Sequence, residues 1–125
     1  MAHTILLVDD DASIRQIERR YLERDGYHVL QAAGAREAIE LIESGPAIDL
    51  IITDLAMPDM GGEQLVAHLR PNRPTLKVLY VSGRLDGLEH RQSLADTEGI
   101  LAKPFTRGQL GEAVSALLSR VTGSE

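Results

Sequence analysis

Five short apolar runs, each followed by polar or turn-forming residues, constrain the fold of this chain more than any other feature. They cover residues 3–8, 27–32, 50–54, 76–81 and 100–102. Short apolar runs bounded by turn residues are typical of strands that are buried on both faces of a sheet. The segments between them carry apolar residues at helical spacing. This alternation predicts a parallel sheet with helices on both of its faces.

The segments between the runs also carry signals for helix starts and ends. Helices are expected from Asp11 or Ser13 to Asp25-Gly26, from Gly34 to about Gly45, over 64–70 and 85–95, and from Thr106 onwards. Gly26 can adopt the left-handed conformation that ends many helices. Thr106 and Gln109, three residues apart, form a capping-box pattern. Each strand is therefore expected to be followed by one helix, which gives five βα units.

The first expected helix is amphipathic, and Asp11 is the residue expected to cap it. Its apolar residues share one face: Ile14, Ile17, Tyr21 and Leu22. Its charged residues are expected on the side that faces solvent: Arg15, Glu18, Arg19 and Glu23. This division predicts which side of the helix packs on the sheet.

Composition limits the function classes that the chain can serve. Its 125 residues, 43% of them hydrophobic, suit one domain over 1–125 with a core at about 4–120. Cysteine is absent, so there is no disulfide framework and no thiolate metal site. A net charge of −6 argues against direct nucleic-acid binding through a basic face. No apolar run approaches about 20 residues, so we expect a cytoplasmic domain that does not bind a membrane.

Polar side chains follow four of the five expected strands. Asp9 and Asp10 follow the first, Asp54 ends the third, Ser82 follows the fourth and Lys103 follows the fifth. Five right-handed βα units form either a Rossmann-like or a flavodoxin-like sheet. The carboxyl ends of parallel strands meet at one edge, and in a 2-1-3-4-5 order these four strands are neighbours. We therefore expect these side chains to converge in one cleft.

This set of side chains suits phosphoryl transfer. The three carboxylates repel one another unless a cation lies among them, and hard oxygen ligands suit Mg²⁺. Lys103 can bind a phosphate as a point charge, and the Ser82 hydroxyl can donate a hydrogen bond to it. A central carboxylate can act as a nucleophile and form an aspartyl phosphate. The pattern predicts phosphoryl transfer onto Asp54, although an aspartate in this position can also serve merely to cap the next element.

Six short motifs together resemble a known family. They are Val8-Asp9-Asp10, Thr53-Asp54, Met57-Pro58, Gly62, Val81-Ser82-Gly83 and Lys103-Pro104-Phe105. In this order and at these spacings, the chain from Thr4 to about Arg120 resembles the response-regulator receiver domain of two-component signalling. It is similar to the single-domain chemotaxis regulators, and residues 74–83 also resemble receivers attached to hybrid sensor kinases.

The resemblance implies a fold and a signalling role. The fold is a flavodoxin-like, three-layer α/β/α arrangement of five parallel strands in the order 2-1-3-4-5. Asp54 would accept a phosphoryl group from a phosphohistidine on a histidine kinase or phosphotransfer protein, and Ser82 and Lys103 would bind that group. The Lys103–Pro104 peptide is often cis in this family. The domain would catalyse only its own phosphorylation and dephosphorylation, and it would signal through a downstream protein or the rest of a hybrid kinase.

The resemblance also implies a Mg²⁺ site. Asp10, Asp54 and the main-chain carbonyl of Ala56 would hold the ion, with Asp9 helping through a water molecule. The same cation would then balance the carboxylate charges that the sequence places together.

Two departures from the family pattern matter. Ile100 stands where an aromatic residue is common, so it would form the conformational switch with Ser82 through a smaller or different packing change. Ala56 and Arg84 stand at the positions that flank the path of attacking water. We hypothesise that they set the lifetime of the phosphorylated state, because Ala56 has no side chain that could orient that water.

Two alternative functions remain open on the sequence alone. The first is a Mg²⁺-dependent phosphohydrolase that acts through an aspartyl phosphate. That class usually has a second aspartate two residues after the nucleophile, where this chain has Ala56. The second is a degenerate receiver that acts only as an interaction module, against which the intact set of site residues argues. Sustained substrate turnover would favour the first, and absence of Mg²⁺ binding and phosphoryl uptake would favour the second.

Overall fold

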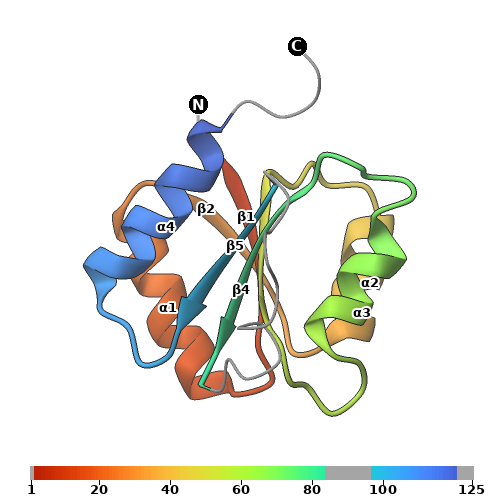
Figure 1. The fold of residues 1–125 in the computed structure, drawn as a ribbon, viewed down its shortest axis with the longest axis horizontal. Coiled ribbons are helices and arrows are strands. Elements are labelled where there is room, and N and C mark those ends of the chain that lie inside the picture. The colour runs from red at the N-terminus through yellow and green to blue at the C-terminus, as the bar shows by residue number, and fades with distance from the viewer. Residues whose placement is uncertain (1, 84–96, 121–125) are drawn as a thin grey trace.

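The computed structural model describes residues 2–83 and 97–120, which form a parallel sheet between two layers of helices (Figure 1). The five strands are β1 (Thr4–Val8), β2 (His28–Ala32), β3 (Leu50–Asp54), β4 (Lys77–Ser82) and β5 (Glu98–Ala102). All neighbouring pairs are parallel and the strand order is β2-β1-β3-β4-β5. The predicted flavodoxin-like topology is confirmed, and the Rossmann-like alternative is not adopted.

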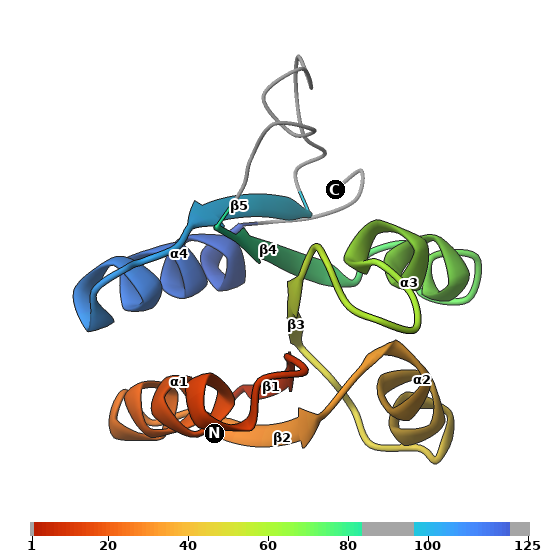
Figure 2. The same ribbon diagram turned by 90° about the horizontal axis from the view of Figure 1, so that it is seen from below.

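Four helices cover the sheet in the part of the chain that the structure describes. They are α1 (Ala12–Arg24), α2 (Ala35–Glu43), α3 (Gly62–Leu69) and α4 (Arg107–Ser119). Figure 2 shows α1 and α4 on one face of the sheet and α2 and α3 on the other. The helix expected over 85–95 lies outside the described residues. None of the helices in the described ranges is long and apolar enough to cross a membrane.

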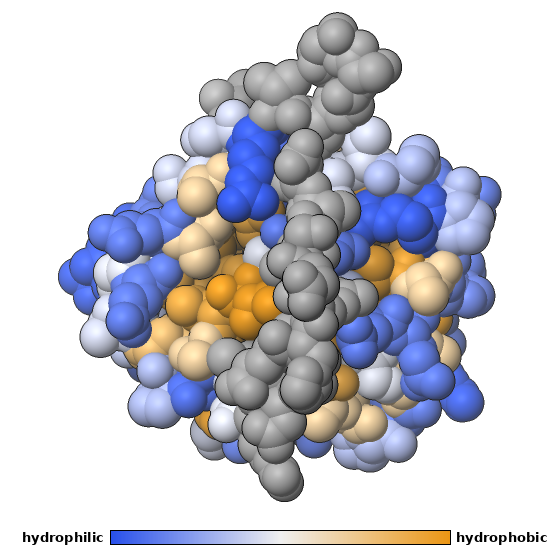
Figure 3. All heavy atoms as spheres, viewed as in Figure 1, coloured by the Kyte–Doolittle hydropathy of each residue, from blue (hydrophilic) through white to orange (hydrophobic). Residues whose placement is uncertain are grey.

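The core consists of two hydrophobic clusters, one on each face of the sheet. Strand residues contribute to both in alternation, so Ile51 packs on the α2–α3 side and Ile52 on the α1–α4 side. The central strands β1 and β3 are therefore buried on both faces, as the apolar runs predicted. The edge strand β5 has no fully buried residue, and hydrophobic side chains are visible beside it in Figure 3. Ile100 is partly buried against the α2–α3 cluster.

The predicted helix ends are confirmed at three places. The Asp11 side chain accepts hydrogen bonds from the backbone nitrogens of Ser13 and Ile14 at 2.9 and 3.1 Å. Gly26 follows α1 with a φ of +96°, a conformation that side chains rarely adopt. Thr106 and Gln109 form the reciprocal capping box at the start of α4. The element bounds differ from the predicted ones by one or two residues, which is the usual uncertainty of helix and strand ends.

The predicted division of α1 into apolar and polar faces was wrong at two residues. Glu18 is buried, with only 3% of its surface exposed, whereas Ile17 is 48% exposed. The centre of the buried face runs through Glu18 and Leu22, which lie one turn apart on the helix. The apolar residues Ile14 and Tyr21 are only half-buried at its edge. A carboxylate therefore occupies a core-facing position.

The start of α2 is capped from a distant loop rather than by its own N-cap residue. Gly34 has no side chain to cap the helix, and the Asp59 carboxylate accepts hydrogen bonds from the Ala35 and Arg36 nitrogens at 3.4 and 3.0 Å. The bond from the Arg36 nitrogen is the main reason why the pKa of Asp59 is lowered, and burial acts against it. Asp59 thus ties the loop after β3 to the start of α2.

Replacing Asp59 with alanine is expected to lower the free energy of unfolding by about 1 kcal/mol, the usual loss for a helix cap. Asp59→Asn, which keeps one acceptor oxygen, should lose less. The native pKa lies below the unfolded value, so this contribution is complete above that value and declines as pH falls through the native one. Urea unfolding at pH 7 measures the difference, and equal stability of native protein and Asp59→Ala would contradict the capping role.

Candidate functional site

Three carboxylates meet at the carboxyl edge of the sheet. Asp9 and Asp10 directly follow β1, and Asp54 is the last residue of β3, which pairs with β1. One oxygen from each of the three lies within 4.8 Å of the others. Asp9 is buried, Asp54 is partly buried and Asp10 is exposed. The sheet therefore assembles a cluster of negative charge that opens to solvent on the Asp10 side.

Lys103 extends into this cluster from the end of β5. Its Nζ donates hydrogen bonds to Asp54 Oδ2 at 3.0 Å and to Asp9 Oδ2 at 3.2 Å. Burial lowers the pKa of the Lys103 ammonium, but the hydrogen bond to Asp54 and the charges of Asp54 and Asp9 outweigh burial and raise it. The peptide bond to Pro104 is cis, as the resemblance implied. Lys103 is therefore fully charged at neutral pH and spans two of the carboxylates.

Ser82 lies between the strands that supply Asp54 and Lys103. It is the last residue of β4, which pairs with β3 on one side and with β5 on the other. Its side chain is buried, and its carbonyl accepts a hydrogen bond from the Lys103 nitrogen at 2.8 Å. The five predicted side chains thus lie at the ends of four neighbouring strands. Ala56 is exposed in the loop after β3, and Arg84 lies outside the described residues.

Arg15 has a contact that the sequence did not indicate. It was expected on the solvent side of α1, but its Nη1 donates to the main-chain carbonyl of Asp9 at 2.6 Å and its Nε donates to Gln31 Oε1 at 3.2 Å. The Asp9 carboxylate also accepts a hydrogen bond from the Asp11 nitrogen at 2.8 Å. The backbone that carries Asp9 is therefore fixed from α1 and β2. No spacing rule predicts a hydrogen bond from a helix side chain to a strand-end carbonyl.

Gly62 allows the start of α3 to lie very close to the backbone of Asp54. A Cβ at this position would lie 2.5 Å from the main-chain oxygen of Asp54 and 3.2 Å from Thr53 Cγ2. The Gly62 nitrogen donates to the Leu55 carbonyl at 2.9 Å, and Leu55 donates to the Val81 carbonyl at 3.1 Å. The start of α3 is therefore packed directly against the end of β3.

The donor set of the carboxylate cluster fits Mg²⁺. Mg²⁺ prefers oxygen ligands, usually one or two carboxylates, and keeps several of its waters. Asp9, Asp10 and Asp54 supply three carboxylate oxygens close to one another, and the exposure of Asp10 leaves room for water. Carboxylates held this close favour binding of a cation.

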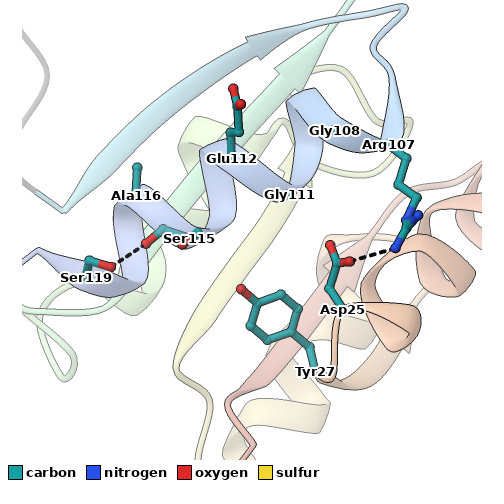
Figure 4. A pocket seen from close by; sticks show the side chains of 9 residues that line it. All are labelled: Asp25, Tyr27, Arg107, Gly108, Gly111, Glu112, Ser115, Ala116 and Ser119. Atoms are coloured by element: carbon teal, nitrogen blue, oxygen red, sulfur yellow. Dashed lines mark hydrogen bonds and ion pairs between the residues drawn. The ribbon is translucent and has the colours of Figure 1, made fainter.

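A separate hollow lies away from these residues. It has a volume of about 780 Å³ and lies between α4 and the turn after α1. Figure 4 shows Arg107 paired with Asp25 beside it, at 3.0 Å, with Tyr27 pointing toward α4. It contains none of the predicted site residues, so the chemistry suggested by the carboxylate cluster does not extend there.

Comparison with known proteins identifies the family. The model of the response regulator receiver domain matches residues 5–115. The chain is 37% identical over 119 residues to the sensor kinase CckA of Brucella abortus, a match that covers 94% of this chain and 13% of that protein. It spans about half the length of the transcriptional regulators that it also matches.

Solved structures agree with this match. The crystal structure of a response regulator receiver protein from Sinorhizobium medicae has a TM-score of 0.83 and 36% identity over 94% of both chains. The response regulator TrrA of Thermotoga maritima, solved in complex with Mg(2+)-BeF, has a TM-score of 0.79 and 27% identity over 92% of this chain and 98% of that one. The chain therefore belongs to the response-regulator receiver domain family of two-component systems, whose members are phosphorylation-dependent signalling modules rather than classical enzymes.

Proposed function

We propose that residues 1–125 form a single receiver domain that takes up a phosphoryl group on Asp54. The observation that carries the proposal is the position of Asp54, whose Oδ2 lies 3.0 Å from the Lys103 ammonium and whose carboxylate belongs to the three-carboxylate cluster. The Asp54 oxygen attacks the phosphorus of a phosphohistidine, and the bond from phosphorus to the histidine nitrogen breaks. The donor is a histidine kinase or phosphotransfer protein.

The chain's own residues hold the transferred group. Lys103, already beside Asp54, pairs with a phosphoryl oxygen, and the Ser82 hydroxyl donates a hydrogen bond to another. Receiver domains bind Mg²⁺ at an acidic site, and the bound ion would neutralise the negative charge on the phosphoryl oxygens. Asp10, Asp54 and the Ala56 carbonyl would hold it, with Asp9 acting through water.

The output of the switch passes to a protein partner. The match to CckA suggests the remainder of a hybrid kinase as one such partner, because this chain covers 13% of that protein. Ser82 and Ile100 form the proposed switch. Since Ile100 is smaller than an aromatic residue and already partly buried, its rearrangement is expected to be slight.

Intact mass after incubation with Mg²⁺ and acetyl phosphate tests the proposal. The native chain is expected to gain one phosphoryl group, and Asp54→Asn is expected to gain none. Asp49→Asn, directly before the same strand, is the matched control and should gain one group like the native chain. Lack of uptake by the native chain, or uptake by Asp54→Asn, would overturn the assignment. Sustained hydrolysis of a phosphate monoester would instead indicate the phosphohydrolase.

A further inference from the structure

Glu18 is a buried carboxyl group that the proposed reaction does not use. It lies on the core-facing side of α1 with 3% of its surface exposed. Its Oε1 has no hydrogen-bond partner among the residues that the structure describes. Burial of an unpaired polar group is costly, and such groups in folded proteins often mark a functional role.

A cavity of about 500 Å³ is lined by both Glu18 and Lys103. Glu18 lines it from α1 and Lys103 lines it from the end of β5, while the other lining residues are uncharged: Ile14, Ile17, Tyr21, Gly83, Pro104 and Phe105. Glu18 and Lys103 therefore face a common, mainly apolar space. Charges in such surroundings interact more strongly than they do in water.

Among the residues that the structure describes, the charged groups that act on Glu18 belong to the site. Lys103 lines the same cavity, Asp9 at the end of β1 and Asp54 at the end of β3 act on Glu18 through their charges, and Tyr21 is a titratable neighbour on α1 itself. Burial raises the pKa of the Glu18 carboxyl to about 7, with Lys103 lowering the pKa and Asp9 and Asp54 raising it. Glu18 is therefore mainly neutral near pH 6 and mainly negatively charged near pH 8.

We propose that Glu18 is a positioning residue that acts through Lys103: its ionised carboxylate attracts the Lys103 ammonium and weakens the hold of Lys103 on the phosphoryl group at Asp54. This inference rests on the proposed function. A negative charge beside Lys103 also cancels part of the positive potential that attracts an anionic phosphodonor. Ionisation of Glu18 thus slows phosphoryl uptake, and its protonation removes this restraint.

The test compares initial rates of phosphorylation by acetyl phosphate at pH 6 and pH 8, with Mg²⁺ held constant and intact mass as the readout. Glu18→Gln and Glu18→Leu both remove the charge, and each rate is divided by the native rate at the same pH, which cancels the pH dependence of the donor. The ratio is expected to be near 1 at pH 6 and roughly three- to tenfold at pH 8. Glu23→Gln, an exposed residue of the same helix, is the control and should give a ratio of 1 at both pH values.

A second measurement tests the coupling without phosphorylation. Carbon-13 NMR of the Glu18 carboxyl gives its titration midpoint, which should rise in Lys103→Met because the cation that favours the charged form is gone. A merely structural role for Glu18 would change the rate ratio equally at both pH values.

The outcomes separate the inference from the proposed function. A native chain that gains no phosphoryl group overturns the proposed function and this inference with it. A native chain that is phosphorylated, with rate ratios that do not differ between pH 6 and pH 8, overturns the inference alone. An unchanged Glu18 midpoint in Lys103→Met also overturns it.

Discussion

Replacing Gly62 with alanine is expected to lower the free energy of unfolding by about 3 kcal/mol, at the upper end of overpacking effects. The added Cβ would lie 2.5 Å from the main-chain oxygen of Asp54, a separation that real structures essentially never show. That oxygen cannot move freely, because Asp54 is paired with Val81 in the sheet and the next residue, Leu55, donates a hydrogen bond to the Val81 carbonyl. Either α3 or the end of β3 must shift.

Gly108→Ala is the matched control for this substitution. Gly108 lies in the first turn of α4, where the nearest atom to an added Cβ is Thr106 Oγ1 at 3.8 Å. Alanine has a higher helix propensity than glycine, so this variant should be as stable as the native chain or slightly more stable. Urea unfolding measures both variants. Equal stability of Gly62→Ala and Gly108→Ala would contradict this prediction. It would mean that the loop after β3 moves to make room for the added methyl group without loss of stability.

A shift at Gly62 would also move the proposed phosphorylation site. The atom that the new methyl group displaces is the main-chain oxygen of Asp54 itself, so the Asp54 carboxylate would no longer lie in the same place relative to Lys103. The variant is therefore expected to take up a phosphoryl group more slowly than the native chain even at temperatures where it remains folded. Gly62 thus links the packing of α3 to the geometry of the carboxylate cluster.

The positions of the strand-end residues could be predicted because they depend on a repeating pattern. Apolar runs fix where each strand ends, and parallel strands bring these ends to one edge. Asp9, Asp54 and Lys103 were therefore brought together by topology alone. The cap of α1 by Asp11 followed from local sequence in the same way, since the donors are only two and three residues away.

The features that the sequence did not reveal depend on contacts between distant segments. Asp59 caps a helix that begins more than twenty residues earlier in the chain, as the 24-residue separation from Ala35 shows. Arg15 reaches the Asp9 carbonyl only because α1 packs next to the end of β1. Glu18 was assigned to solvent because it is charged, but its place one turn before Leu22 puts it on the buried face. In that case helical geometry, rather than residue type, was the better guide.

Removal of the Lys103 charge should destabilise the chain most strongly when Mg²⁺ is absent. Lys103→Met leaves the buried Asp9 carboxylate and the partly buried Asp54 carboxylate without the ammonium that now lies 3.2 and 3.0 Å from them. Loss of one partner of a buried ion pair costs about 3–5 kcal/mol. Lys103 retains 20% exposure of its side chain, so solvent screening reduces the expected loss to about 2 kcal/mol. Arg107→Met, which breaks the more exposed pair with Asp25, is the control and should lose less than about 1 kcal/mol.

Mg²⁺ should restore much of this lost stability, because an ion at the proposed site would neutralise the same carboxylates as Lys103. In the native chain, a bound cation must share Asp9 and Asp54 with the ammonium, whereas in Lys103→Met it meets no competing positive charge. Mg²⁺ is therefore expected to bind Lys103→Met more tightly and to raise its melting temperature by more than it raises that of the native chain or of Arg107→Met. Thermal unfolding over a Mg²⁺ titration measures this difference. An equal rise in all three proteins would mean that Lys103 and the ion do not compete, and that the ion binds away from Asp9 and Asp54.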